Sequence, residues 1–253
     1  MSNLKLFLLV VLTFASIPRM AHSLDLTILT EDYAPYNYEK NGKITGFTTE
    51  IVQAILADTG NSELKIELYP WQRAYRMASR EKNILLYTMT RTQARESLFR
   101  WAGPVAERTV WVWKLRSRQD IKVATLEDAK KYTITSVTNS AGTNYLKSQG
   151  FTDKQLNPIH KESLSVAKFL AGRDDLILKP KLAMAYELSQ LGESISLVEP
   201  LIALPDSGAY YLAFSLDTPI STVTLFQNSL DKLKQNGTYD KIYKKYMVTS
   251  SEL

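Results

Sequence analysis

The chain has 253 residues, of which 45% are hydrophobic and 23% are charged, with 10 glycines and 9 prolines. This composition is typical of a folded globular protein and argues against disorder, collagen and coiled coil. The formal net charge at pH 7 is +5, and the basic residues are dispersed, which argues against nucleic-acid binding. Because the sequence has no cysteine and only His22 and His160 as histidines, we expect no disulfide, no metal site and no Ser-His-Asp triad.

The first 23 residues are typical of a secretory signal peptide. Lys5 is followed by a mostly apolar run. Ala21 and Ser23 supply small side chains at the two positions that a signal peptidase recognises before its cleavage site. The run is shorter than the roughly 20 residues that a membrane-spanning helix needs, and an uncleaved anchor helix is the alternative. We expect cleavage after Ser23, which gives an exported mature protein that begins at Leu24 and resides in the periplasm.

The mature sequence alternates the two-residue hydrophobic period of strands with the 3.6-residue period of helices. The first half predicts strands at 24–30, 64–68, 84–89 and 109–115, helices capped by Thr48 or Thr49 and opened by Pro70, and a helical turn at 91–98. The second half predicts a capping box at Thr125 and Asp128, strands at 132–137, 175–178, 196–198 and 210–214, and helices at 142–148, 163–171, 182–191, 220–235 and 238–247. This order predicts an α/β fold whose helices cross over between strands.

The elements divide into two α/β lobes. We expect a first lobe at 24–115, a second lobe at 116–203, and a return to the first lobe with the C-terminal helices at 204–253. The candidate crossings between the lobes are 115–121 and 200–208, and we expect the lobes to close by hinge motion there. Exported proteins with two such lobes commonly bind ligand in the cleft between them.

Seven short motifs, in order along the chain, resemble one protein family. They are Tyr33-Ala-Pro-Tyr36, Gly42-x-x-x-Gly46-Phe47-x-x-Glu50-Ile51, Pro70-Trp71-x-Arg73-Ala74, Arg91-Thr-x-x-Arg95-Glu96, Trp101-x-Gly103-Pro104, Leu170-Ala-Gly172-Arg173 and Asn236-Gly237-Thr238-Tyr239-x-Lys241-Ile242-Tyr243. Together they resemble the bacterial solute-binding proteins of family 3, which include polar amino-acid receptors of ABC importers. The resemblance implies the type II periplasmic-binding-protein fold, with two hinge strands and a closed form that docks on a membrane permease or sensor.

The resemblance also implies where the ligand binds. Arg95 occupies the position at which the family has an arginine that binds the ligand carboxylate. The planar guanidinium suits this role because it donates two parallel hydrogen bonds to a carboxylate. The alternative is a surface arginine paired with Glu96 or Asp58. Thr88 and Thr90, on the preceding strand end, occupy positions that offer hydroxyl and backbone groups to the same ligand, although ordinary β-propensity also explains them.

Further candidates lie on the second lobe and beside Arg95. Asn139, Ser140 and Ala141 stand between a strand and a helix, where free backbone N–H groups bind anions and where a plain helix cap is the alternative. Arg91 is either a second anion contact or a member of a salt bridge, and the sequence leaves both open.

Aromatic residues are the candidates for the cleft walls. Tyr33, Tyr36 and Trp71 can stack on a cation or an amide, with Tyr36 and Trp71 preferred, although a hydrophobic core explains any one of them equally well. Glu50, at a helix start, is expected to be structural. His160 is expected to be an exposed loop residue.

The resemblance implies one more position, the acid that binds the α-ammonium in amino-acid receptors of the family. It follows the strand after the Ala-Gly-Arg motif, and here that place falls at Pro180, with Lys179 and Lys181 beside it. We therefore expect the carboxylate contact to be kept and α-amine recognition to be lost or moved. The alternative is that Glu50 or Asp174 supplies the charge from another direction.

These expectations describe a monomeric periplasmic protein that captures a small polar, carboxylate-bearing, amino-acid-like solute and delivers it to an ABC-type importer. It needs no metal or cofactor, binds no nucleic acid and does not insert into the membrane after cleavage. A ligand sensor for a membrane receptor is the first alternative, and an exported dehydratase on the same fold is the second. We expect no enzyme, because no histidine is placed as a general acid or base, and the adjacent carboxylates Asp174 and Asp175 face opposite sides of a strand.

Overall fold

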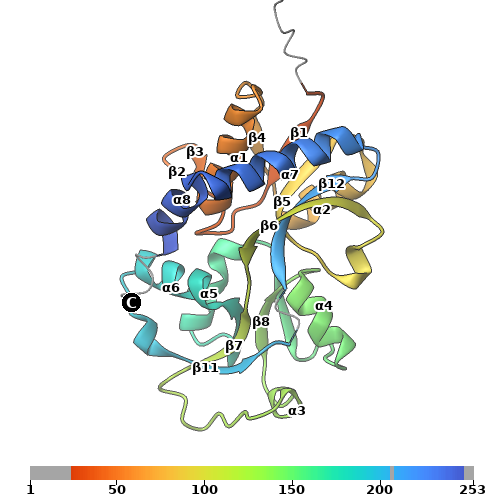
Figure 1. Cartoon of the computed structure of the whole chain (residues 1–253). Coiled ribbons are helices and arrows are strands. Elements are labelled where there is room, and N and C mark those ends of the chain that lie inside the picture. The colour runs from red at the N-terminus through yellow and green to blue at the C-terminus, as the bar shows by residue number, and fades with distance from the viewer. Residues whose placement is uncertain (1–23, 206–207, 248–253) are drawn as a thin grey trace, which may run out of the picture.

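The structure is a computed structural model that describes residues 24–205 and 208–247 as two lobes, one above the other (Figure 1). The expected signal peptide lies outside the described residues, so its cleavage stays a prediction. Within the described residues, no helix combines the length and the apolar character that a membrane span requires.

The first lobe is built on a five-stranded sheet with the order β4-β1-β5-β12-β6. Its strands are β1 (Thr27–Thr30), β4 (Ile66–Leu68), β5 (Ile84–Thr90), β6 (Phe99–Glu107) and β12 (Ala209–Ser215). β1 is parallel to β4 and β5, whereas β12 is antiparallel to β5 and β6. A ribbon of β2 (Tyr38–Lys40) and β3 (Lys43–Thr45) connects β1 to the first helix.

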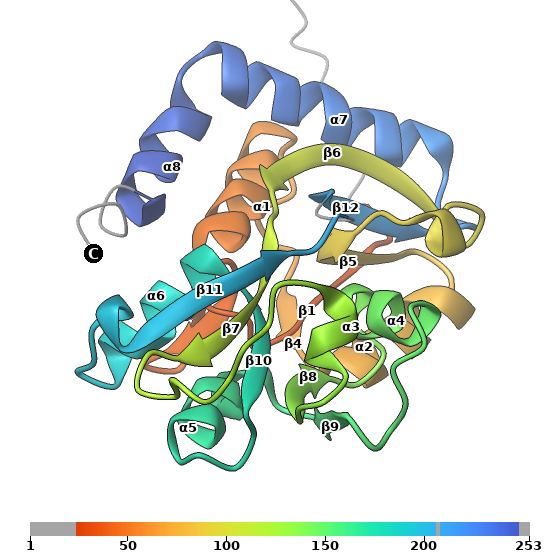
Figure 2. The ribbon, with the colours of Figure 1, turned by 90° about the horizontal axis from the view of Figure 1, so that it is seen from below.

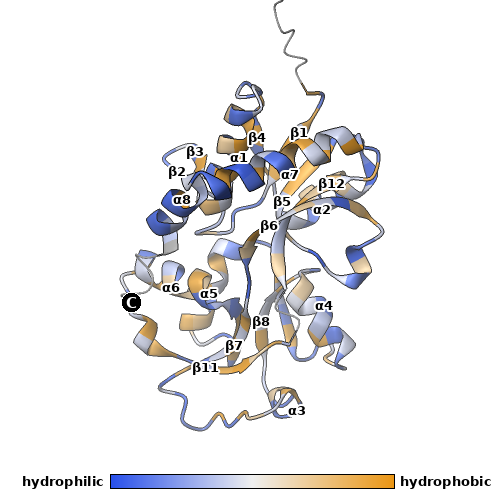
Figure 3. Ribbon diagram, in the orientation of Figure 1, coloured by the Kyte–Doolittle hydropathy of each residue, from blue (hydrophilic) through white to orange (hydrophobic). Residues whose placement is uncertain are grey.

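Helices cover both faces of this sheet because its strands are apolar on both sides. Ile28, Leu85 and Phe214 face α1 (Phe47–Asp58) and α7 (Ile220–Gln235), while Leu29 and Leu86 face α2 (Trp71–Arg80). α8 (Thr238–Met247) follows α7 along the outer side of the lobe (Figure 2). Hydrophobic strands lie between helices that carry polar residues outward (Figure 3).

The second lobe has a five-stranded sheet with the order β11-β7-β10-β8-β9. Its strands are β7 (Val110–Leu115), β8 (Ile134–Val137), β9 (Leu156–Ile159), β10 (Leu176–Pro180) and β11 (Val198–Ala203). Its helices are α3 (Leu126–Ala129), α4 (Ala141–Ser148), α5 (Ser165–Leu170) and α6 (Lys181–Gln190), with 3-10 turns at Gln93–Arg95 in the first lobe and at Glu162–Leu164 and Ile195–Leu197 here. Separate cores fill the two faces of the sheet.

The lobe boundary differs from the predicted one at residue 115. β7 pairs with β10 and β11, so the whole strand belongs to the second lobe and the chain crosses at 108–109. The return crossing occupies 204–208, and the Arg108 amide donates to the Gly208 carbonyl at 3.3 Å, which holds the two crossings side by side.

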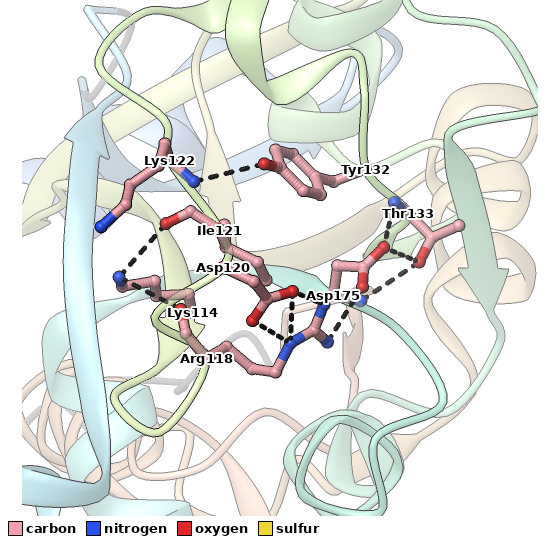
Figure 4. Close-up of polar contacts among 8 residues, drawn as sticks. All are labelled: Lys114, Arg118, Asp120, Ile121, Lys122, Tyr132, Thr133 and Asp175. Atoms are coloured by element: carbon pink, nitrogen blue, oxygen red, sulfur yellow. Dashed lines mark hydrogen bonds and ion pairs between the residues drawn. The ribbon is translucent and has the colours of Figure 1, made fainter.

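The segment 115–121, predicted as a crossing, is a loop inside the second lobe (Figure 4). Arg118 pairs with Asp120 at 2.7 Å and with Asp175 at 3.1 Å. The Lys114 ammonium donates to the carbonyl oxygens of Arg118 and Ile121. These contacts fasten the loop to its own lobe, so it does not connect the lobes.

Helix α1 begins differently from its prediction. Its N-cap is Gly46, whose φ of 117° suits glycine, and no side chain caps the helix. Thr48 and Thr49 are buried within the first turn, where the Thr49 hydroxyl bonds the Tyr87 hydroxyl at 2.9 Å. By contrast, the capping box at Thr125 is confirmed.

Candidate functional site

A cavity lies between the two lobes and encloses about 590 Å³ of empty space, its open mouth included. Small-molecule sites occur preferentially at such interfaces between domains. Most of the predicted ligand-binding residues line it, from both lobes: Tyr33, Trp71, Thr88, Thr90, Arg95, Ser140 and Ala141.

Arg95 lies in the 3-10 turn after β5, and its side chain reaches the cavity wall. It is only 5% exposed, and its guanidinium donates to the carbonyl oxygens of Thr90 at 3.1 Å and Asn139 at 3.3 Å. The rings of Trp71 and Tyr75 each lie 5.1 Å from its central carbon. Burial lowers the pKa of Arg95.

Among the described residues, Arg95 forms no ion pair, which removes the alternative of a surface salt bridge. Glu96 pairs instead with Arg91, and Asp58 with Lys232. A buried cation without a counter-ion is costly unless a ligand supplies the negative charge. The geometry of Arg95 therefore suits an anionic group in the cavity.

The Asn139 carbonyl joins the lobes at the edge of the cavity. It accepts from Arg95 and also from the Trp71 indole N–H at 3.3 Å, both of which belong to the first lobe. Asn139 has a φ of 57°, a conformation that asparagine tolerates. Ser140 then caps α4 by accepting from the Thr143 amide at 3.2 Å, and Ala141 opens the helix.

Thr88 is the strained residue of the site. Its φ is 62°, which is rare for a β-branched residue, and it is the extra residue of a bulge, since Tyr211 is opposite Met89 and Leu212 is opposite Tyr87. The Thr88 hydroxyl is buried without a hydrogen-bond partner. Strain and an unsatisfied polar atom of this kind are typical of ligand sites.

Three predicted ligand residues are not part of the cavity lining, namely Asn139, whose carbonyl lies at its edge, and Tyr36 and Arg91. Tyr36 is 3% exposed and belongs to the first-lobe core, where its ring packs 4.8 Å from Tyr210. Arg91 forms a two-point salt bridge with Glu96, with its Nε 2.7 Å from that carboxylate, so its salt-bridge alternative holds. Tyr36 thus occupies a core position and Arg91 an ion pair, which are the alternatives stated for these two residues.

Neither of the carboxylates predicted as substitutes for the missing acid enters the cavity. Glu50 pairs with Lys245 at 2.5 Å on the outside of the first lobe. Asp174 is buried in the second lobe, where it pairs with Lys168 at 2.9 Å. His160 is exposed, as expected.

Sequence reasoning missed three charged residues of the cavity wall, namely Glu31, Arg108 and Glu162. Glu31 directly follows β1, and a polar residue after a parallel strand is a signal that could have found it. The pKa of Glu31 is raised to about 8, chiefly by burial and secondly by the negative charge of the Glu162 carboxylate. Arg108 stands at the first crossing, is 7% exposed and lies 5.9 Å from the Tyr210 ring.

Lys179 is not among the residues that line the cavity. Its ammonium is fully buried between Glu162 at 2.7 Å and Glu187 at 2.6 Å, with the Ser165 hydroxyl at 2.6 Å. Burial acts to lower the pKa of Lys179, but the two carboxylates outweigh it and the pKa lies above its ordinary value. Pro180 lines the cavity and carries no charge, so no acid stands at the position implied for α-amine binding.

Two α/β lobes joined by two crossing segments, with a cavity between them, define a periplasmic-binding-protein fold. The predicted fold is confirmed. The chain belongs to the bacterial extracellular solute-binding proteins, family 3, whose model matches residues 26–249. The proteins compared below are binding or sensor proteins.

The chain is 22% identical over 221 residues to a probable histidine-binding protein of Neisseria gonorrhoeae, which covers 85% of this chain and 80% of that protein. It is similar to a histidine kinase sensor domain with a TM-score of 0.78 and 18% identity, over 89% of this chain and 97% of the other. It is also similar to an ancestral arginine-binding protein bound to arginine, with a TM-score of 0.74 and 19% identity, over 89% and 100%. At these identities the two structures show the fold alone.

Proposed function

We propose that this protein captures a small polar solute that carries a carboxylate, in the cleft between its lobes. In this proposal it works in the periplasm as a monomer and delivers the solute to an ABC-type importer. The observation that carries the proposal is Arg95, a buried guanidinium on the cavity wall without an ion-pair partner among the described residues.

The surrounding groups support an anion at this place. Arg95 comes from the first lobe, and the N-terminus of α4 at Ala141 comes from the second, with its first amides free of intrahelical bonds. The unpartnered Thr88 hydroxyl can donate to the same carboxylate. An anion held by donors of both lobes favours the closed form, which is the form that a transporter partner would recognise.

Relatives support delivery to an importer. One similar structure is the substrate binding protein of an amino acid ABC transporter, with a TM-score of 0.72 and 17% identity. Sensing is the second candidate, and the similarity to a histidine kinase sensor domain favours it. Capture of the permease or of a receptor by the liganded protein distinguishes these two outputs.

A thermal-shift screen of small metabolites tests the proposal, because a ligand that binds only the folded protein raises the melting temperature. We expect the compounds that stabilise the protein to share a carboxylate. Arg95→Met removes the guanidinium, and the shifts should disappear in that variant. Arg76→Met, at an exposed position of α2, is the matched control and should keep them. Shifts that persist in Arg95→Met, or that only uncharged compounds cause, would refute the proposal.

A further inference from the structure

Helix α2 carries three exposed arginines, Arg73, Arg76 and Arg80. At about 100° per residue, these positions fall within about 60° of one another around the helix axis. They therefore form one row, about 10 Å long, on the side opposite the buried Trp71 and Ala78. Figure 2 shows α2 on the side of the first lobe away from α7 and α8.

The arginine row carries charge that no acid of the described residues neutralises. None of its three members forms an ion pair within the part of the chain that the structure describes. By contrast, two other surface arginines are paired, Arg91 with Glu96 and Arg118 with Asp120. Glu67, the last acid before the helix, accepts from a tyrosine hydroxyl at 2.7 Å instead. The row can therefore meet an anionic partner without first giving up an ion pair.

The sequence around the row is also basic. Residues 71–83 contain four basic side chains, with the exposed Lys82 as the fourth, and Glu81 is their only acid. At the start of the row, the Arg73 guanidinium lies 4.2 Å from the centre of the Tyr69 ring, which favours a fixed position at the surface. The segment thus presents a net positive charge to solvent.

The chemistry of this row favours a planar anionic surface. The guanidinium is always charged and donates two parallel hydrogen bonds to a phosphate. The row stands on the convex outer side of a helix, so a flat surface can contact all three arginines at once. A compact acidic protein would need a groove that matches this convex face. Each basic residue close to an anionic lipid surface strengthens binding about fivefold.

We propose that the exposed face of α2 docks this protein on the surface of an anionic phospholipid membrane, without insertion. None of the three arginines lines the cavity between the lobes, so the docking surface is separate from the solute site. Because α2 begins at Trp71, which lines that cavity, docking by α2 holds the cleft beside the membrane. The inference does not depend on which solute the protein binds.

Co-sedimentation of the mature protein with vesicles tests the inference. One set of vesicles contains phosphatidylglycerol and phosphatidylcholine in equal parts, and the other contains phosphatidylcholine alone. We expect binding to the anionic vesicles at about 0.05 M salt and binding at least about tenfold weaker to the neutral ones. At about 0.5 M salt the binding should disappear, because salt screens the attraction between exposed charges.

Two triple variants remove the same number of charges at different places. The test variant removes the arginine row: Arg73→Gln, Arg76→Gln and Arg80→Gln. The control removes three positive charges at exposed positions outside α2: Lys154→Gln, Lys241→Gln and Lys244→Gln. We expect the test variant to bind the anionic vesicles at least about tenfold more weakly, and the control to bind within about threefold of the unmodified protein. Substitution of all three arginines by lysine keeps the charge and should also retain binding within about threefold.

Equal weakening in the two triple variants would overturn the inference, because total charge rather than the row would then cause binding. Equal binding to anionic and neutral vesicles would overturn it too. So would a loss in the lysine variant as large as in the glutamine variant, with circular dichroism showing that both are folded. Lack of binding to anionic vesicles at low salt would overturn the membrane surface as the partner and leave an acidic protein surface in its place.

Discussion

Lys179→Met removes the ammonium that pairs with two carboxylates, Glu162 of the cavity wall and the buried Glu187. Lys179 is fully buried, and its ammonium is 2.7 Å from Glu162 and 2.6 Å from Glu187. Breaking a buried ion pair by removal of one partner costs about 3–5 kcal/mol, because the other charge stays buried and unpaired. We expect the free energy of unfolding to fall by about that amount at pH 8.

The loss should be smaller at pH 5. Burial already raises the pKa of Glu187 to about 7, and removal of Lys179 raises it further, so protonation relieves the unpaired charge at low pH. Urea unfolding followed by circular dichroism at both values measures the difference. Lys181→Met is the matched control two residues along, on an exposed side chain, and should change the free energy of unfolding by at most about 0.5 kcal/mol.

A loss in Lys179→Met below about 1 kcal/mol, or one equal to that of Lys181→Met, would refute the reasoning. The triple variant Lys179→Met, Glu162→Gln, Glu187→Gln removes all three charges. It should recover most of the lost stability, since no unpaired charge remains.

Three further predictions concern the backbone, the pH dependence and lobe closure. Gly46→Ala should lower the free energy of unfolding by about 2–4 kcal/mol, because a Cβ at Gly46 would lie 2.5 Å from the Tyr36 carbonyl oxygen. Gly42→Ala, also at positive φ but with open space around it, should cost only about 1 kcal/mol in the same urea titration; equal losses would contradict the steric argument. The pKa of Glu31 is raised from 4.5 to about 8, so the stability that Glu31 contributes is present below pH 4.5 and is lost as the pH rises through 8. Glu31→Gln removes this titration and should flatten the plot of unfolding free energy against pH in that range. An unchanged plot would contradict the prediction. Small-angle scattering should give a smaller radius of gyration with a tight ligand than without, by hinge motion at 108–109 and 204–208, and an unchanged radius would argue against closure.

Strong periodicity made much of the fold predictable from the sequence. The helices at 220–235 and 238–247 have the bounds that were predicted, because their apolar residues recur every three to four positions between clear breaks. Two of the missed strands, β6 and β9, contain a proline, Pro104 and Pro158, which interrupts the pattern. Both strands are at the edges of their sheets, where proline costs no ladder hydrogen bond.

The site was predictable in part. Arg95 was predicted from its motif, and Thr88 and Thr90 were predicted from the end of their strand. All three line the cavity between the lobes. Glu31 and Glu162 lie 131 residues apart and line one cavity only because the two lobes face each other, so local sequence carries no sign that both belong to it.

The contact between Arg95 and a solute carboxylate is the centre of this account. A thermodynamic cycle measures it directly: calorimetry of the tightest-binding carboxylate and of its methyl ester, each with the unmodified protein and with Arg95→Met. A charge-assisted contact contributes about 1.5–3 kcal/mol, so the account predicts that esterification weakens binding to the unmodified protein by at least about tenfold and leaves binding to Arg95→Met almost unchanged. An equal loss on esterification in both proteins would contradict it.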